Sequence, residues 1–324
     1  MCLAYTSFAV RMLQGRDILK STAQALPAGG LADLCERFWA GGMQLDLSQL
    51  ESHEPAYLKA LRDRVEGAGL WLELSVPFRY LESPEAYAEM ATMASALGVD
   101  RIRVALLYGR RYESFDTREA WTAFDEKWRR QLAAIKPVIE RHPIRVGIEN
   151  HKDFTAGELA ELLRRLDSPQ IGATVDFGNN VSLLEAPLDT IRTLAPFAVT
   201  THVKDMAVRR SDGGFELSEV PLGRGLVPLA DAVRLLREAR PDVRFCLEMI
   251  TRDPLPVPYR TDRYWIAVDR PAAADLTRFE RDVLGRSWAD PLPRISHLDP
   301  EAQIAAEDDN VRTSVDYAKN VLDL

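Results

Sequence analysis

Residues 145–204 contain three short apolar segments, RVGIEN at 145–150, IGATVDF at 171–177 and VTTHVK at 199–204. Helical patterns at 155–166 and 188–194 separate them, and Thr155 followed by Glu158 is a typical helix-start signal. Short apolar segments that alternate with helices are typical of parallel βαβ units, because parallel strands need a crossover connection. This stretch therefore predicts neighbouring parallel strands in one sheet.

The same alternation continues in both directions along the chain. Further strands are expected at 3–10, 43–48, 70–76, 101–107 and 245–250, and further helices at 31–40, 55–68, 84–97, 117–141 and 229–239. Eight strands are the number that closes a (β/α)8 barrel. An open doubly wound sheet shares the alternation, but no G-x-G-x-x-G follows the first strand. We therefore expect an α/β fold, a (β/α)8 TIM barrel.

The last part of the chain departs from this pattern. Residues 251–264 contain three prolines and no periodicity, and weaker helical patterns follow at 272–284 and 300–322. We interpret 251–324 as the last barrel helix plus a C-terminal helical extension, packed on the barrel or on a partner subunit. The whole chain, 1–324, is then a single domain with a barrel core at about 3–250. The sequence does not decide whether the protein forms a homo-oligomer.

Composition excludes several classes of protein. The 324 residues include 41 Lys and Arg against 49 Asp and Glu, a formal net charge of −8, which is unsuited to a broad nucleic-acid surface. No apolar stretch approaches the roughly 18–20 residues that span a bilayer. The cysteines, Cys2, Cys35 and Cys246, are odd in number and lack C-x-x-C spacing. We expect reduced thiols in a cytoplasmic protein.

Side-chain alternation along the last four expected barrel strands points to a metal site. If the apolar residues of each strand face the helices, then Glu149, Asp176, His202 and Glu248 face the barrel interior. All four lie near the C-terminal ends of their strands, where barrel enzymes build active sites. Buried carboxylates repel one another unless a cation lies between them. An oxygen-rich set favours Mn²⁺, then Mg²⁺ or Co²⁺, and the imidazole keeps Zn²⁺ open.

The segments IENHKDFT, ATVDFGNN, THVKD, PLGRG and LEMI resemble the xylose-isomerase-like barrel superfamily of sugar and sugar-phosphate isomerases and epimerases. The resemblance covers roughly residues 3–250. It implies that Glu149, Asp176, His202 and Glu248 bind one divalent metal, and that Glu149 and Glu248 also exchange protons with the substrate. The superfamily also includes dehydratases, a decarboxylating branch and endonuclease IV, so the motifs do not specify a reaction.

Four neighbouring residues are candidate substrate contacts. His151 lies two residues beyond Glu149 and could bind a substrate hydroxyl or carboxylate or act as an acid or base, although a loop histidine can also cap the next helix. Lys204 could hold an anionic oxygen, or it could be a solvated lysine. Arg103 either contacts substrate or forms an ion pair with a carboxylate such as Glu73 or Asp46. Arg252, which follows the last strand, is likewise a candidate substrate contact. The PLGRG segment either covers the substrate or is a helix-entry turn.

The first functional hypothesis is a divalent-metal-dependent isomerase or epimerase of a small sugar, keto-sugar or sugar acid. The metal chelates a carbonyl and an adjacent hydroxyl, one glutamate removes a proton to give a cis-enediolate, and the other returns it. The alternative is a metal-dependent lyase, a dehydratase or decarboxylase of an inosose or a sugar-derived keto acid. The basic residues near the site favour an anionic substrate and thereby this alternative.

Two further hypotheses have less support. An endonuclease IV-like nuclease needs several more histidines, yet the chain has five, of which three are expected away from the strand ends: His53, His142 and His297. A binding barrel without catalysis would not need the complete four-ligand set. The sequence does not specify the substrate, because specificity depends on loop geometry.

Overall fold

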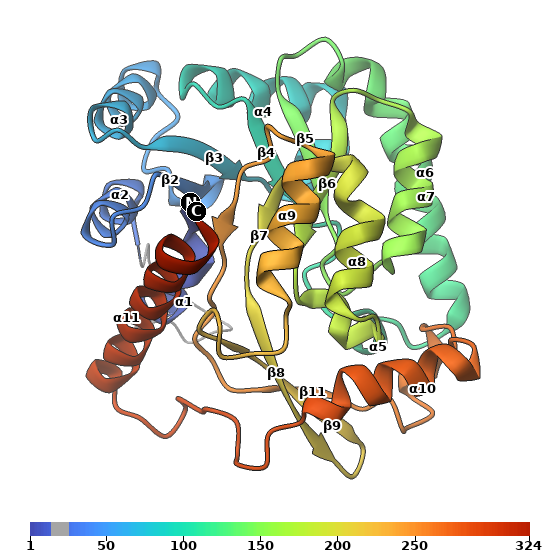
Figure 1. The fold of residues 1–324 in the computed structure, drawn as a ribbon. Coiled ribbons are helices and arrows are strands. Elements are labelled where there is room, and N and C mark those ends of the chain that lie inside the picture. The colour runs from blue at the N-terminus through green and yellow to red at the C-terminus, as the bar shows by residue number, and fades with distance from the viewer. Residues whose placement is uncertain (14–25) are drawn as a thin grey trace.

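The computed structural model describes residues 1–13 and 26–324 and shows a parallel sheet rolled into a barrel with helices around it (Figure 1). The sheet has eight strands in the order β10-β1-β2-β3-β4-β5-β6-β7, with parallel neighbours. Bridges from Thr200 to Arg244 and from Val203 to Leu247 connect β7 to β10 and bring the sheet back to its first edge. The predicted (β/α)8 TIM barrel is confirmed.

The barrel strands are short and buried. They are β1 (Cys2–Ala4), β2 (Gly42–Asp46), β3 (Trp71–Ser75), β4 (Arg101–Val104), β5 (Arg145–Glu149), β6 (Ile171–Asp176), β7 (Ala198–His202) and β10 (Cys246–Leu247). The helices are α1 (Ala9–Leu13), α2 (Ala28–Arg37), α3 (Pro55–Gly67), α4 (Pro84–Ala96), α5 (Arg111–Ser114), α6 (Arg118–Ile139), α7 (Ala156–Leu166), α8 (Pro187–Leu194), α9 (Leu229–Ala239), α10 (Ala273–Asp282) and α11 (Pro300–Tyr317). Among the described residues, no helix is long and apolar enough to cross a bilayer.

Local sequence signals explain where several helices begin and end. Thr155 and Glu158 form a capping box at the start of α7, as the sequence predicts. Gly69 and Gly98 follow α3 and α4 with φ of 72° and 73°, a conformation that glycine adopts without steric cost. These stops let each helix return the chain to the next strand.

The C-terminal segment provides both a barrel helix and an extension. Helix α11 lies beside α2 (Figure 1), where Arg37 pairs with Asp308 at 2.8 Å, and the residues after α11 reach α9, where Arg237 donates to the Asp323 carbonyl at 2.6 Å. Helix α10 contacts α8, where Arg278 pairs with Asp189 at 2.8 Å. The expected last helix and C-terminal helical extension are therefore both present.

The expected strand at 3–10 is wrong beyond Ala4. A 3-10 turn, Tyr5–Phe8, and helix α1 replace it. Phe8 and Val10 are buried, as in the expected strand, but Val10 donates its backbone N–H to Glu307 of α11 rather than to a neighbouring strand. A buried apolar run alone did not distinguish the strand from this turn and helix.

An antiparallel hairpin lies between the seventh barrel strand and the helix expected at 229–239. Strands β8 (Asp205–Ser211) and β9 (Gly214–Val220) pair with each other, and β11 (Leu255–Val257) adds to β9. The hairpin turn is Asp212–Gly213, and a D-G dipeptide between alternating residues is a hairpin signal that could have predicted it.

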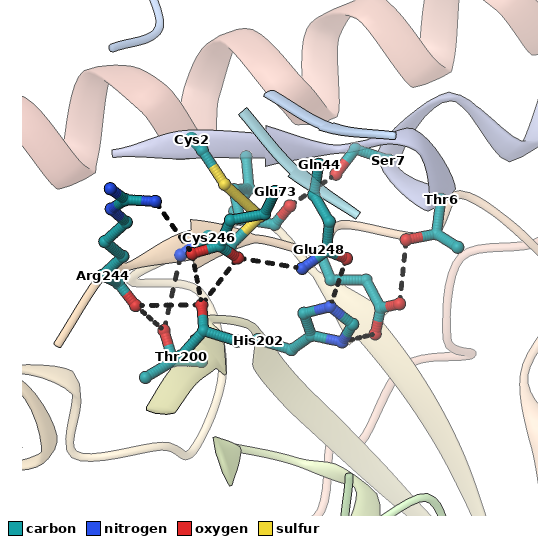
Figure 2. Close-up of a disulfide and its surroundings, with 12 residues drawn as sticks. Cys2, Thr6, Ser7, Gln44, Glu73, Thr200, His202, Arg244, Cys246 and Glu248 are labelled. Atoms are coloured by element: carbon teal, nitrogen blue, oxygen red, sulfur yellow. Dashed lines mark hydrogen bonds and ion pairs between the residues drawn. A yellow bond between two sulfur atoms is a disulfide. The ribbon is translucent and has the colours of Figure 1, made fainter. Parts of the chain in front are cut away.

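The expectation of three reduced cysteines is also wrong. The structure joins Cys2 and Cys246 by a disulfide (Figure 2). Cys35 is free and buried. The two cysteines are 244 positions apart in sequence, but they face each other in the β1–β10 register with a Cα–Cα distance of 4.4 Å. Only the closure of the barrel brings them together, so spacing along the chain gave no signal.

Candidate metal centre and substrate cavity

Four ionisable side chains converge inside the C-terminal end of the barrel. Glu149 ends β5, Asp176 ends β6, His202 ends β7, and Glu248 directly follows β10. Each offers one ligand atom, and these atoms all lie within 4.8 Å of one another. All four side chains are buried. The structure thus brings together the four residues that the strand alternation selected, and their role as ligands stays a prediction.

The orientation of His202 fits a bound cation. Its Nε2–H donates to Gln44 Oε1 at 2.8 Å (Figure 2), because an amide oxygen can only accept. Nδ1 has no hydrogen-bond partner among the described residues and faces Glu149 Oε1 at 3.3 Å and Glu248 Oε2 at 3.4 Å. A buried, unpartnered imidazole nitrogen among carboxylates is suited to coordinate a divalent metal.

The charges of this cluster indicate the same need for a cation. Burial opposes a charged imidazole, yet Glu248 and Glu149 raise the pKa of His202 to about 9. Burial also opposes the charged form of Glu149, but Arg103 holds the pKa of that carboxyl well below its usual range. The carboxylates thus draw positive charge into the site, and a divalent cation would supply it instead of a proton on His202.

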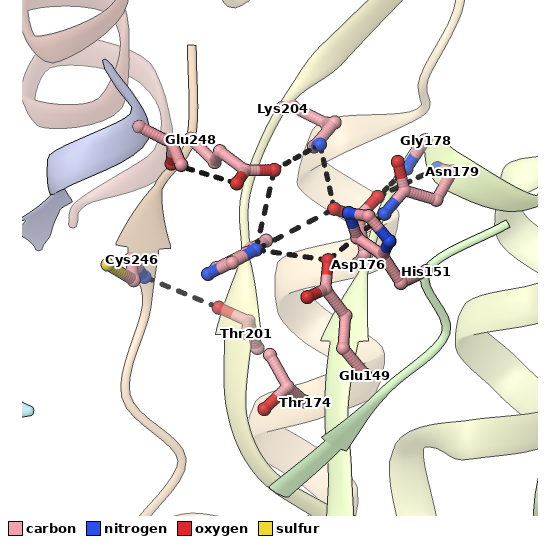
Figure 3. Close-up of polar contacts among 12 residues, drawn as sticks. Glu149, His151, Thr174, Asp176, Gly178, Asn179, Thr201, Lys204, Cys246 and Glu248 are labelled. Atoms are coloured by element: carbon pink, nitrogen blue, oxygen red, sulfur yellow. Dashed lines mark hydrogen bonds and ion pairs between the residues drawn. The ribbon is translucent and has the colours of Figure 1, made fainter. Parts of the chain in front are cut away.

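Two predicted substrate residues are tied to carboxylates of the cluster. Arg103 forms an ion pair with Glu149 through Nε and Nη2 and donates to Ser75 Oγ at 3.0 Å. Lys204 Nζ lies 2.8 Å from Asp176 Oδ2 and also pairs with Glu248 (Figure 3). Arg103 therefore does pair with a carboxylate, but with that of Glu149 rather than with Glu73 or Asp46, the two partners that the sequence suggested. Lys204 is buried, so it is not a solvated strand-end lysine.

The other two predicted substrate residues line a cavity above the cluster. His151 Nδ1–H donates to the Leu107 carbonyl at 2.8 Å, and burial lowers the pKa of His151 to about 3. The ring is therefore neutral, with Nε2 left as an acceptor suited to a hydroxyl. Arg252 Nη2 pairs with Glu219 Oε1 of β9 at 2.6 Å. His151 does not cap α7, because Thr155 does.

This cavity has a volume of about 390 Å³. Its wall consists of Tyr5, Thr6, Arg103, Tyr108, Gly109, Arg110, Glu113, His151, Lys152, Glu248, Ile250, Arg252 and Leu255. It includes one carboxylate of the four-residue cluster, Glu248, so a ligand in the cavity reaches the proposed metal site. A cavity of this size accommodates a small ligand.

Sequence reasoning missed several residues that hold the cluster in place. Gln44 orients His202, Thr6 Oγ1 donates to Glu248 Oε1 at 2.8 Å, and Asn179 Nδ2 donates to Glu149 Oε1 at 3.0 Å. Gln44 could have been found, because an isolated polar residue between the apolar Met43 and Leu45 of a strand indicates an inward position. Thr6 and Asn179 lie outside the strands, where alternation gives no direction.

The PLGRG segment does not offer its amides to a ligand. The Asp205 carboxylate accepts hydrogen bonds from the backbone N–H groups of Gly223 at 3.0 Å and Gly225 at 2.8 Å. It also accepts from Val227 at 2.9 Å. An internal carboxylate thus occupies the place that an anion would need.

Comparison with known proteins identifies the family. The model of the xylose isomerase-like TIM barrel family matches residues 38–268, more than half of the chain. The chain belongs to this family. A curated relative of the chain is an enzyme, a decarboxylase, so the chain has an enzyme among its relatives.

The proteins that resemble this chain have different names and activities. The chain is 31% identical over 221 residues to 3-oxo-isoapionate decarboxylase of Pectobacterium atrosepticum. The aligned region covers 66% of this chain and 74% of the relative. A crystal structure of D-psicose 3-epimerase with D-fructose superposes with a TM-score of 0.63 at 14% identity, covering 99% and 98% of the two chains. The crystal structure of a xylose isomerase-like TIM barrel protein from Mycobacterium smegmatis in complex with magnesium superposes with a TM-score of 0.57 at 16% identity. The superposition covers 86% of this chain and 97% of the other. The last two show the shared fold alone.

Proposed function

We propose that the protein is a divalent-metal-dependent isomerase or epimerase of a small sugar, keto-sugar or sugar acid. The observation that carries the proposal is the buried His202 Nδ1, without a hydrogen-bond partner in the described chain, facing the carboxylates of Glu149 and Glu248. Glu149, Asp176, His202 and Glu248 would hold the metal. When bound, a divalent cation would polarise a substrate carbonyl and make the adjacent C–H bond more acidic.

The two glutamates would differ in their chemical tasks. Glu248 lies on the cavity wall, where it would remove a proton from a substrate carbon. Thr6 and Lys204 both donate to Glu248, which fixes the direction of its carboxylate. Glu149 would supply a proton, either to the opposite face of the same carbon or to its neighbour. Each glutamate pairs with a cation, Glu149 with Arg103 and Glu248 with Lys204.

A metal-dependent lyase is the second candidate, and two observations favour it. Glu149 pairs with Arg103 and Glu248 with Lys204, so both bases that an epimerase needs are restrained. The relative that is 31% identical is a decarboxylase. Loss of CO₂ from a keto acid needs stabilisation of the resulting enolate but no second base. Dehydration of an inosose begins with the same proton removal and then expels a hydroxyl.

One experiment separates these reactions. Keto-sugars, inososes and sugar-derived keto acids are incubated with the protein and Mn²⁺ in D₂O and followed by NMR. Isomerisation or epimerisation puts deuterium on the reacting carbon and leaves the carbon skeleton intact. Loss of CO₂ or of water identifies the lyase instead. No reaction and no deuterium exchange with any metal would overturn the proposal.

Substitution of Glu248 tests its role as the base. Glu248→Gln keeps the shape of the side chain but removes its basicity, so we expect kcat to fall by at least about 10²-fold with the fold intact. The matched control is Glu82→Gln, an exposed glutamate that pairs with Lys127 and does not line the cavity. Equal kcat values for the wild type and Glu248→Gln would remove Glu248 from this role.

Three finer expectations belong to the same proposal. Mn²⁺ is the first candidate metal, because three of the four ligands are carboxylates, and Mg²⁺, Co²⁺ and Zn²⁺ follow. The substrate is a small polyhydroxylated carbonyl compound, with no nucleic acid or membrane partner. We also propose a cytoplasmic location and leave a homo-oligomer open, to be tested by fractionation and by light scattering.

A further inference from the structure

Lys152 is a buried cation without a partner at the wall of the substrate cavity. Its exposed fraction is 5%, and it lines the cavity beside His151 and Arg252. Among residues 1–13 and 26–324, nothing makes a hydrogen bond or ion pair with its Nζ. An unpaired ammonium is costly to bury, so its position needs an explanation.

Every other cation around the site has a carboxylate partner. Arg103 pairs with Glu149, Lys204 with Asp176, Arg110 with Glu113 at 2.5 Å, and Arg252 with Glu219. The carboxylates near the cavity are thus already engaged. A divalent metal would add positive charge to a site that already has this unpaired cation.

The backbone around Lys152 turns its side chain into the cavity. Strand alternation would point Lys152 away from the side that Glu149 and His151 share, but its φ of 66° reverses that direction. The Lys152 carbonyl accepts from Arg111 N–H at 3.0 Å, and Asp153 Oδ1 accepts from the N–H of His151 at 3.0 Å. This left-handed conformation is unfavourable for lysine and is held by these contacts.

We propose that Lys152 binds a carboxylate of the substrate, so that the substrate is a polyhydroxylated acid rather than a neutral sugar. The inference rests on the proposed function and assigns its substrate class. His151 holds the Leu107 carbonyl through Nδ1, which leaves Nε2 for a substrate hydroxyl near this carboxylate. Burial, Lys204 and Arg252 lower the pKa of Lys152 to about 8, so the ammonium is still the main form at pH 7.

A carboxylate fits this position better than a phosphate. One free ammonium matches a single negative charge, whereas a phosphate dianion usually needs several donors. The backbone amides of the PLGRG segment do not supply them, because those of Gly223 and Gly225 donate to the Asp205 carboxylate.

The test compares acids with their neutral counterparts by isothermal titration calorimetry, with and without Mn²⁺. The probes are D-gluconate and D-erythronate, against D-glucitol and erythritol, with D-glucitol 6-phosphate as the phosphate arm. We expect the wild type to bind at least one acid about 10-fold more tightly than its polyol. Lys152→Gln should lose this preference and keep its affinity for the polyol, whereas Lys152→Arg should keep most of it.

Controls keep the result interpretable. Lys127→Gln removes an exposed lysine on α6 and should leave all affinities unchanged. Thermal unfolding checks that each variant is folded. If Lys152→Gln does not fold, Lys152→Asn takes its place, because asparagine adopts the left-handed conformation more readily. Acid binding no tighter than polyol binding, a preference that survives in Lys152→Gln, or tighter binding of the phosphate would overturn the inference. Loss of Mn²⁺ binding with the acid preference intact would instead contradict the proposed function.

Discussion

The direction of the His202 ring depends on Gln44, whose own amide is oriented by Glu73. Gln44 Nε2 donates to Glu73 Oε2 at 3.4 Å, which leaves Gln44 Oε1 to accept from His202. Groups that orient a metal-binding histidine typically change metal affinity by 10–100-fold. We therefore predict that Gln44→Leu weakens Mn²⁺ binding by about 10–100-fold, as measured by titration of the purified protein.

The control for this substitution is Gln131→Leu. Gln131 donates to the Leu81 carbonyl away from the cluster, so its loss should leave Mn²⁺ affinity unchanged. If Gln44→Leu binds Mn²⁺ as tightly as the wild type, then Gln44 does not position His202 for a metal.

At the residue scale, the sequence predicted which side chains converge better than it predicted their partners. Strand alternation selected Glu149, Asp176, His202 and Glu248, since each follows the alternation of its own strand. The partner of Arg103 was missed, because an arginine on a barrel wall reaches several carboxylates and only the tertiary structure decides among them. Lys152 was missed because its positive φ breaks the alternation.

At the scale of elements, the segment that leads into α9 is held by one carboxylate. Asp205 accepts from four backbone N–H groups, those of Met206, Gly223, Gly225 and Val227. We predict that Asp205→Ala lowers the free energy of unfolding by roughly 2–4 kcal/mol, because it leaves buried donors unpaired. Urea denaturation measures the change. The exposed Asp212→Ala in the hairpin turn is the control, and an equal loss in both variants would contradict this account.

A second element-scale prediction concerns the contact between α11 and the N-terminal segment. Burial raises the pKa of Glu307 to about 7, although Arg11 and the Val10 N–H oppose the shift. A carboxyl whose pKa is higher in the folded state stabilises the fold below its unfolded pKa of about 4.5. That contribution is lost as pH rises through 7. The wild type should therefore lose stability relative to Glu307→Gln between pH 5 and pH 8.

Linkage limits the size of this effect to about 3 kcal/mol. Urea denaturation of both proteins at pH 5, 6, 7 and 8 measures it, with Glu301→Gln on the exposed side of α11 as the control. A stability difference between the wild type and Glu307→Gln that stays constant over this range would show that Glu307 does not titrate as described.

At the scale of the whole molecule, the periodic part of the sequence predicted the barrel. The contacts that depend on closure of the barrel were not predictable from it. Alternating strands and helices repeat locally, so each βαβ unit is visible in the sequence. The Cys2–Cys246 disulfide and the packing of α11 against the N-terminal segment depend on both ends of the chain meeting at one seam. The hairpin β8–β9 was not predicted, although it had a local signal in Asp212–Gly213.

The central claim is that the four side chains at the end of the barrel hold one divalent cation, and a Mn²⁺ titration followed by electron paramagnetic resonance tests it most directly. The chelator-treated wild type should bind one Mn²⁺ per chain. Asp176→Asn keeps an oxygen for the Gly178 and Asn179 amides but loses the charge, so its affinity should fall at least about 10-fold. The exposed Asp231→Asn should bind as the wild type does. Absence of Mn²⁺ binding in the wild type, or equal affinity in Asp176→Asn, would contradict the account.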